Sequence, residues 1–251
     1  MTRIALITGA SRGLGRNTAL AVARGGGDVV LTYRSNADEA QAVVAEIEAL
    51  GRKAVALQLD TGEVAAFPAF VEQLRTALRE TWQREAFDHL VNNAGHGDTA
   101  PIAETTVAQF DRLVDVHFKG VFFLTQALLP LISDGGRIVN ISTGLTRFAY
   151  PGYAAYAATK AAVETLSVYM AKEFGTRGIA VNTVAPGAIE TDFGGGAVRD
   201  NAQINAQLAG ITALGRVGVA DDIGPMIASL LGEANRWVNA QRIEVSGGQA
   251  I

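Results

Sequence analysis

Short apolar runs rich in β-branched residues alternate with longer segments of helical period along almost the whole chain. Several of the short runs are continuously hydrophobic, as strands buried on both faces of a sheet are. The strand candidates are Arg3–Thr8, Asp28–Tyr33, Ala54–Leu59, His89–Asn92, Arg137–Ile141, Ala180–Val184 and Arg242–Val245. The segments near 13–25, 36–50, 63–81, 106–132, 152–174 and 219–232 are long enough for helices. This alternation predicts βαβ units built around a parallel sheet.

Composition narrows the class of protein further. The 251 residues are 49% hydrophobic and 18% charged, which predicts a single globular domain, 1–251, with a large core. The net charge is −4 and the charges form no long block, so we expect neither a nucleic acid nor a membrane partner. Cysteine is absent and the three histidines are scattered, so we expect no metal site. We therefore interpret the chain as a cytoplasmic protein.

One long region, Pro186–Gly215, has no clear period and contains three consecutive glycines. A loop of this length inside a compact domain is usually functional. It follows the sixth predicted strand, at the edge of a parallel sheet where open α/β folds bind ligands. We therefore interpret 188–214 as a mobile substrate-binding lid.

A glycine-rich turn, TGASRGLG at residues 8–15, joins the first predicted strand to the first predicted helix. Small residues let a backbone approach a pyrophosphate closely, and a helix N-terminus offers free N–H groups. Its position favours dinucleotide binding over an ordinary glycine-rich turn. The predicted cofactor contacts here are Gly9, Ser11, Arg12, Gly13, Leu14 and Gly15.

The residues after the second strand favour NADP(H) over NAD(H). A site that prefers NAD places a carboxylate there to bind the ribose hydroxyls. This chain instead reads Thr32-Tyr33-Arg34, and Arg12 adds a second cation within the glycine turn. Two guanidinium groups suit a 2′-phosphate, which they bind bidentately. The alternative is that both arginines are solvated surface residues.

The strongest chemical signal is Tyr156-Ala157-Ala158-Thr159-Lys160, which places a phenol and an ammonium four residues apart on one helix face. A phenol in water titrates near pH 10, and a neighbouring cation lowers that pKa by favouring phenolate. Tyr156 is therefore a candidate general acid for a carbonyl oxygen.

The chain resembles the short-chain dehydrogenase/reductase family over essentially its whole length. The resemblance rests on TGASRGLG (8–15), Asp60, NNAG (92–95), IVNIST (138–143), YAATK (156–160), PGAIET (186–191) and SGG (246–248). It implies a Rossmann-type, doubly wound, three-layer α/β/α fold with seven parallel strands. It also implies an NAD(P) cofactor, hydride transfer between a carbonyl and an alcohol, and a homotetramer or homodimer.

By position, Tyr156 resembles the family's catalytic acid, and Lys160 resembles the residue that holds the nicotinamide ribose and depresses the tyrosine pKa. Asp60, followed by Thr61, resembles the adenine-contacting position. The remaining cofactor contacts that the resemblance implies are Asn92, Ala94, Gly95, Pro186, Gly187, Ile189 and Thr191.

Two positions depart from the family pattern. The catalytic serine position is occupied by Thr143, and Ser142 stands next to it. Side chains alternate along a strand, so we assign the hydrogen-bond donor to Thr143 and keep Ser142 as the alternative. His117 replaces a family asparagine that supports a water-mediated proton relay, and we include it among the catalytic candidates.

The sequence thus predicts an NADPH-dependent enzyme that reduces a ketone or a 3-oxoacyl-type carbonyl, reversibly. One alternative is an NAD(H)-dependent dehydrogenase of a sugar, polyol or hydroxysteroid. Another is a dinucleotide-binding regulator without catalytic activity, which the changes at Thr143 and His117 would suit.

Overall fold

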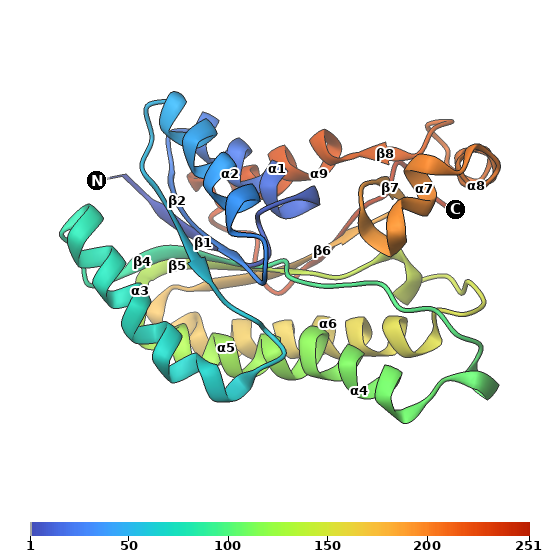
Figure 1. The fold of residues 1–251 in the computed structure, drawn as a ribbon, viewed down its shortest axis with the longest axis horizontal. Helices are drawn as coiled ribbons and strands as arrows, with labels where there is room; N and C mark the ends of the chain where they lie inside the picture. The colour runs from blue at the N-terminus through green and yellow to red at the C-terminus, as the bar shows by residue number, and fades with distance from the viewer. Residues whose placement is uncertain (1) are drawn as a thin grey trace.

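In the computed structural model, which describes residues 2–251, one parallel sheet of seven strands forms the centre of the molecule (Figure 1). The strand order is β3-β2-β1-β4-β5-β6-β9. The strands are β1 Ile4–Ile7, β2 Asp28–Tyr33, β3 Ala54–Gln58, β4 Phe87–Asn92, β5 Ile132–Ile141, β6 Ala180–Pro186 and β9 Arg242–Val245. This order confirms the doubly wound, Rossmann-type prediction.

Helices cover both faces of the sheet (Figure 1). One layer contains α1 Gly13–Arg24, α2 Ala37–Ala49 and α9 Ala220–Leu230, and the other contains α3 Phe67–Trp82, α4 Val107–Val114, α5 Gly120–Leu128 and α6 Ala154–Phe174. Alternate residues of β1 point to opposite layers, so Ala5 and Ile7 join one core cluster while Ile4 and Leu6 join the other. Continuously apolar strands are therefore required to fill two cores.

The helix predicted over 106–132 runs without a gap from Val107 to Leu128, but its middle is not α-helical. Thr106 and Gln109 form the capping box that begins α4, but Asp115–Lys119 is a π-helical turn, and α5 ends at Leu128. After this turn a Cβ on Gly120 would lie 2.1 Å from the carbonyl oxygen of Thr61. A single π turn with i→i+5 hydrogen bonds lies inside the helix without a cap or a break of its own, so the hydrophobic run alone did not reveal it.

The region Pro186–Gly215 is more ordered than the sequence indicated. It contains β7 Ile189–Glu190, which pairs with β8 Gly218–Val219, and the helices α7 Ala197–Asp200 and α8 Ala202–Gly210. Asn201 caps α8 by accepting from the N–H groups of Gln203 and Ile204. Every residue of α8 is at least partly exposed, so this helix has no buried apolar stripe. Such a stripe is the pattern from which a helix is predicted in a sequence. We call 188–214 the lid below.

Within residues 2–251, every helix is too short or too polar to span a bilayer. The same residues contain no cluster of three acidic or histidine side chains arranged to hold a metal ion.

Candidate active site

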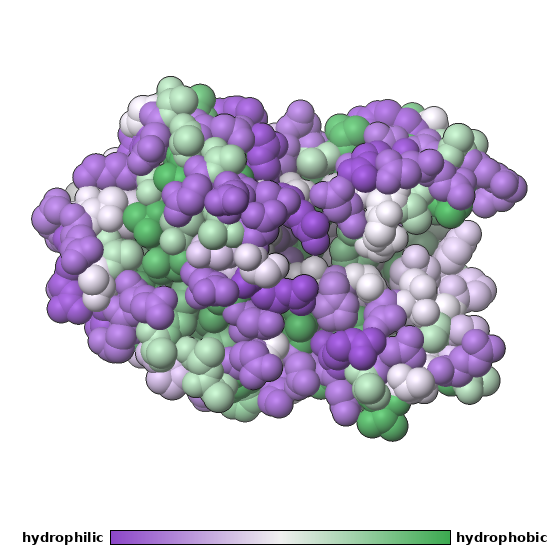
Figure 2. Space-filling model, in the orientation of Figure 1, coloured by the Kyte–Doolittle hydropathy of each residue, from purple (hydrophilic) through white to green (hydrophobic). Residues whose placement is uncertain are grey.

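The carboxyl ends of the parallel strands meet at one edge of the sheet, and the predicted site residues follow these ends. On the side of the molecule seen in Figure 2, the surface is hollowed between the layer of α1 and α2 and the lid. Mostly hydrophilic residues surround this recess. A small pocket beyond the ends of β1, β3 and β4 is lined by Thr8, Thr61, Asn92 and Ala94. The fold therefore gathers residues that lie far apart in the sequence around one site.

The glycine turn requires glycine at several positions. Gly9 and Gly13 have φ angles of 63° and 57°, which residues with a side chain rarely adopt. A Cβ on Gly15 would lie 2.4 Å from the carbonyl oxygen of Gly9. Across the site, a Cβ on Gly13 would come within 4.0 Å of Thr191, so the turn faces the segment after β6. These two predicted cofactor elements are thus brought together.

The start of α1 fits a pyrophosphate. Its first turn, residues 13–16, carries no carboxylate, and within residues 2–251 the N-cap residue Arg12 makes no side-chain cap. The N–H groups there, with the positive end of the helix dipole, are available to an anion. The Thr8 hydroxyl accepts from the N–H groups of Asn93 and Ala94, at 3.0 and 2.9 Å, and fixes the NNAG segment beside the turn.

Arg12 and Arg34 are both exposed at this edge. Among the contacts of residues 2–251, neither guanidinium has a carboxylate or other hydrogen-bond partner. The backbone of Arg34 is held, because the Gln58 amide donates to its carbonyl oxygen at 3.0 Å. Two unneutralised cations on a fixed backbone fit the additional phosphate of NADP(H).

Asp60 and Asn92 each make hydrogen bonds to other protein groups as well as lying at the predicted cofactor site. Asp60 Oδ1 accepts from the N–H of Gly62 at 2.9 Å. The Asn92 amide donates to Asn140 Oδ1 at 2.8 Å and to Thr125 Oγ1 at 3.1 Å, which ties β4 to β5 and α5. Asn92 therefore both lines the pocket and holds neighbouring elements together.

Tyr156 and Lys160 project from α6 into the buried part of the site. Lys160 Nζ donates to the carbonyl oxygen of Ile141 at 2.8 Å and lies 5.9 Å from the centre of the Tyr156 ring. The other two ammonium protons remain for further acceptors. Both residues are buried, so their ionisation depends on their immediate neighbours.

The expected lowering of the Tyr156 pKa by Lys160 is wrong for the protein alone. Burial raises the pKa of Tyr156, Tyr153 adds to the increase, and a side-chain hydrogen bond with Thr143 only partly opposes it. Burial also lowers the pKa of Lys160 to about 7, so its charge is itself costly in this environment. Desolvation of the phenol, which a sequence does not display, is the largest influence on the Tyr156 pKa.

Ser142 and Thr143 point in different directions, as strand alternation predicts. Ser142 Oγ donates to Glu164 Oε1 at 2.6 Å. Thr143 interacts with Tyr156 and accepts from the N–H of Leu145 at 3.3 Å. Of the two candidates, Thr143 is the one that faces the phenol.

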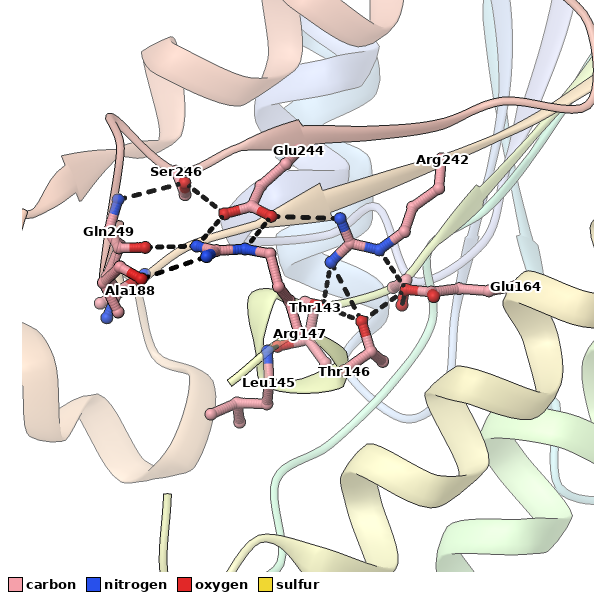
Figure 3. A network of polar contacts seen from close by, with 12 residues as sticks. Thr143, Leu145, Thr146, Arg147, Glu164, Ala188, Arg242, Glu244, Ser246 and Gln249 are labelled. Carbon is pink, nitrogen blue, oxygen red and sulfur yellow. Dashed lines mark hydrogen bonds and ion pairs between the residues drawn. The ribbon is translucent and has the colours of Figure 1, made fainter. Parts of the chain in front are cut away.

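A polar network that sequence reasoning missed holds Thr143 in place (Figure 3). Arg242 on β9 donates to Glu164 Oε1 at 2.9 Å, to the Thr143 carbonyl oxygen at 3.2 Å and to Thr146 Oγ1 at 3.0 Å. Glu164 lies one helical turn after Lys160 on α6. The network therefore joins the loop of Thr143 to the helix that carries Tyr156 and Lys160.

The same network extends to the end of the chain. Arg147 donates to both carboxylate oxygens of Glu244, at 2.7 and 2.8 Å, and to the carbonyl oxygens of Gln249 and Ala250. Gln249 Oε1 in turn accepts from the N–H of Ala188 at 2.8 Å. The alternation of charges in Arg242-Ile243-Glu244, with both charged residues on one face of a strand, was the available sequence signal.

The segment after β6 is fixed from the same side. The Gly187 N–H donates to the Val245 carbonyl oxygen at 3.1 Å, and a Cβ on Gly187 would lie 2.7 Å from Gln249 Oε1. Pro186 ends β6 opposite Val245, and Ile189 begins β7. The predicted contacts at Pro186, Gly187, Ile189 and Thr191 thus lie on one anchored strand exit.

His117 lies in the π-helical turn, fully buried, with its ring 5.2 Å from that of Tyr156 and edge-on to it. Its Nε2 lies 2.7 Å from the carbonyl oxygen and 3.3 Å from the backbone nitrogen of His96, and the shorter contact favours the ring proton on Nε2. Nδ1 is then an acceptor, and it is buried with no partner among residues 2–251. Burial and the nearby Lys160 lower the His117 pKa well below its ordinary value, in the predicted direction.

Comparison with known proteins identifies the family. A family model described as enoyl-(acyl carrier protein) reductase, from the short-chain dehydrogenase/reductase family, matches residues 9–250. The chain belongs to this family, as the sequence motifs predicted. It is an NAD(P)-dependent oxidoreductase that acts on alcohol or carbonyl groups.

Relatives cover nearly the full length. An NADPH-dependent aldehyde reductase-like protein, chloroplastic, of Arabidopsis thaliana is 37% identical, over 98% of this chain and 93% of that protein. The tetrahydroxynaphthalene reductase PfmaG of Pestalotiopsis fici is 34% identical, over 98% and 91%. The structure of the angucycline C-6 ketoreductase LanV with bound NADP is 35% identical, with a TM-score of 0.93 over 99% of this chain and 95% of that one.

Proposed function

We propose that the protein is an NADPH-dependent ketoreductase that converts a ketone or 3-oxoacyl-type carbonyl to an alcohol, reversibly. The observation that carries the proposal is the convergence of Thr143, Lys160 and His117 on the buried Tyr156 phenol. When bound, NADPH supplies the hydride for the carbonyl carbon, and the proton for the oxygen comes from the protein. Relatives named as aldehyde and ketone reductases support a carbonyl substrate.

Tyr156 is the proton donor in this proposal. Because burial raises its pKa, the phenol remains protonated at neutral pH and can donate to a carbonyl oxygen. The Thr143 hydroxyl donates a second hydrogen bond to the same oxygen and stabilises the charge that develops there. Arg242 holds the Thr143 carbonyl at 3.2 Å and is a positioning residue for this donor.

Lys160 and His117 return the proton to Tyr156. Lys160 has ammonium protons left after its bond to Ile141, and they serve a ribose hydroxyl and a water molecule. The free lone pair at His117 Nδ1 accepts from such a water and so takes the place of the family asparagine in the relay. This role requires the neutral imidazole, which burial and Lys160 favour.

NADP(H) is the cofactor because Arg12 and Arg34 carry charge at the edge where the 2′-phosphate belongs. Solved relatives with NADP or NADPH support this choice. Ser11, Leu14, Asp60, Thr61, Ala94 and Gly95 remain predicted cofactor contacts. A cytoplasmic location and a homodimer or homotetramer remain predictions.

The test is a panel of ketones and alcohols assayed with NADPH and with NADH by the absorbance of the reduced nicotinamide. Turnover of ketones with NADPH supports the proposal. Oxidation of a sugar, polyol or hydroxysteroid with NAD⁺ at higher efficiency favours the dehydrogenase alternative. Cofactor binding without turnover of any substrate favours the regulator, although the intact Tyr156 and Lys160 pair speaks against it.

A further inference from the structure

A row of aromatic side chains borders Tyr156 on the side of the lid. The ring centres of Tyr150 and Tyr153 are 6.3 Å apart, those of Tyr153 and Tyr156 are 6.5 Å apart, and those of Tyr156 and Phe193 are 5.7 Å apart. All three pairs are tilted or edge-on, which is ordinary aromatic packing geometry. We call these four residues the aromatic row. The proton donor of the proposed reaction is one of its members.

The ends of the aromatic row are not part of the protein core. Tyr150 is 47% exposed and Phe193 is 43% exposed, although Phe193 lies next to the buried Tyr156 and Tyr150 is joined to it through Tyr153. Aromatic side chains left accessible beside a catalytic group are typical of a binding surface rather than of a fold determinant.

Phe193 lies directly before a run of three glycines in the lid. The next three residues, Gly194–Gly196, all have positive φ angles between 61° and 78°. The phenyl rests over Gly97, where an added Cβ would lie 3.1 Å from Phe193 Cε1. Glycines in such a run permit the rotation that a hinge needs. Phe193 therefore packs beside Tyr156 at a position where a glycine run follows it directly.

The cations around the lid are already neutralised. Arg199 pairs with Asp192 and Asp200, and Arg216 donates to both carboxylate oxygens of Asp222 at 2.6 and 2.8 Å. A 3-oxoacyl group on a carrier protein arrives with a phosphate-bearing arm that needs an accessible cation. The chemistry around the lid therefore favours an uncharged substrate.

We infer that the preferred substrate is an aryl ketone, whose carbonyl carbon is part of or bonded to a flat aromatic ring system. This inference rests on the ketoreductase function proposed above. The ring contacts Tyr153 and Phe193 while the carbonyl oxygen meets the Tyr156 hydroxyl. Each aromatic contact adds a factor of about 2 to 12 to binding beyond the area it buries. A saturated ring of the same size gains the free energy of burial but not this additional factor in binding affinity.

The test compares 1-tetralone with 1-decalone, bicyclic ketones that differ in the aromaticity of one ring. With NADPH, the wild type should reduce 1-tetralone with a kcat/KM at least about fivefold higher, mainly through a lower KM. The substitution Phe193→Leu keeps an apolar side chain and should lower the ratio of the two kcat/KM values by about two- to tenfold. Tyr169→Leu, at a tyrosine of α6 that is 64% exposed and outside the row, is the matched control and should leave the ratio unchanged.

NADPH binding, followed by nicotinamide fluorescence, should be the same in all three proteins. Equal reduction of the two ketones by the wild type overturns the aryl preference while leaving the ketoreductase function in place. An unchanged ratio in Phe193→Leu removes Phe193 from the substrate surface. Failure to reduce either ketone, or any other carbonyl in the panel, contradicts the proposed function itself and the inference with it.

Discussion

Arginines at the two ends of the site are used in opposite ways. At the cofactor edge, Arg12 and Arg34 are exposed, and no carboxylate of residues 2–251 pairs with either. At the catalytic edge, Arg147 and Arg242 both contact Glu244, and their other donors hold the Thr143 loop and the chain end. Neutralised arginines build a scaffold, whereas unneutralised ones on a fixed backbone are available to a ligand. The predictions below test this division.

The largest effect is expected from Tyr156→Phe, which removes only the transferable proton at the catalytic edge. Turnover with NADPH should fall by about 10²- to 10⁴-fold. The fold and the affinity for NADPH should be unchanged, as measured by thermal unfolding and nicotinamide fluorescence. A variant with near-normal turnover would show that another group supplies the proton.

Next in size is the pair Thr143→Ala and Ser142→Ala. Removing the Thr143 hydroxyl should lower kcat by about 10²-fold, the scale of one donor to a developing oxyanion, and Thr143→Ser should retain most activity. Ser142→Ala should have the smaller effect on kcat, because its hydroxyl is bonded to Glu164. The reverse order of the two alanine variants would transfer the donor role to Ser142.

Arg242→Met tests the scaffold side of the comparison. It leaves the mostly buried Glu164 without its cation, so the free energy of unfolding should fall by on the order of 2 kcal/mol, measured in urea. kcat should also fall because the Thr143 carbonyl loses a donor, whereas the ratio of NADPH to NADH efficiency should stay at the wild-type value. Arg242→Lys, which keeps the charge but not the fork of donors, should recover only part of the stability.

His117 is expected to give a smaller, pH-dependent effect. The neutral imidazole is the active form, and its pKa lies well below the ordinary value, so activity should fall only as acid protonates Nδ1 and places a second cation beside Lys160. His117→Asn should stay active and lack this acid-side loss, and His117→Ala should lose roughly tenfold or more in kcat. A His117→Ala enzyme with wild-type kcat from pH 5 to pH 9 would leave His117 a packing residue.

The fold was predictable because each layer imposes its own period on the sequence. The seven strands and the glycine turn could be found from apolar runs and spacing alone. The π-helical turn at His117 and the lid helices could not, since the turn lies inside a helix without a gap and α8 has no buried stripe.

At the site, residue types predicted the chemistry but not the environment. Tyr156 and Lys160 were identified by their spacing, yet the direction of the Tyr156 pKa depends on burial, which a sequence does not display. The network of Arg242 and Glu164 joins residues 78 positions apart, and only the packing of α6 against the sheet brings them together.

The central claim is that unneutralised arginines select the cofactor. The most direct test is the ratio of kcat/KM with NADPH to kcat/KM with NADH. We predict that the wild type uses NADPH over NADH with a kcat/KM advantage of at least about tenfold, the scale of one charge-assisted phosphate contact. Arg34→Asp should erase or invert this advantage, while Arg24→Asp, at an arginine near the far end of α1, should leave it unchanged. Equal efficiency of the two cofactors with the wild type would contradict the account.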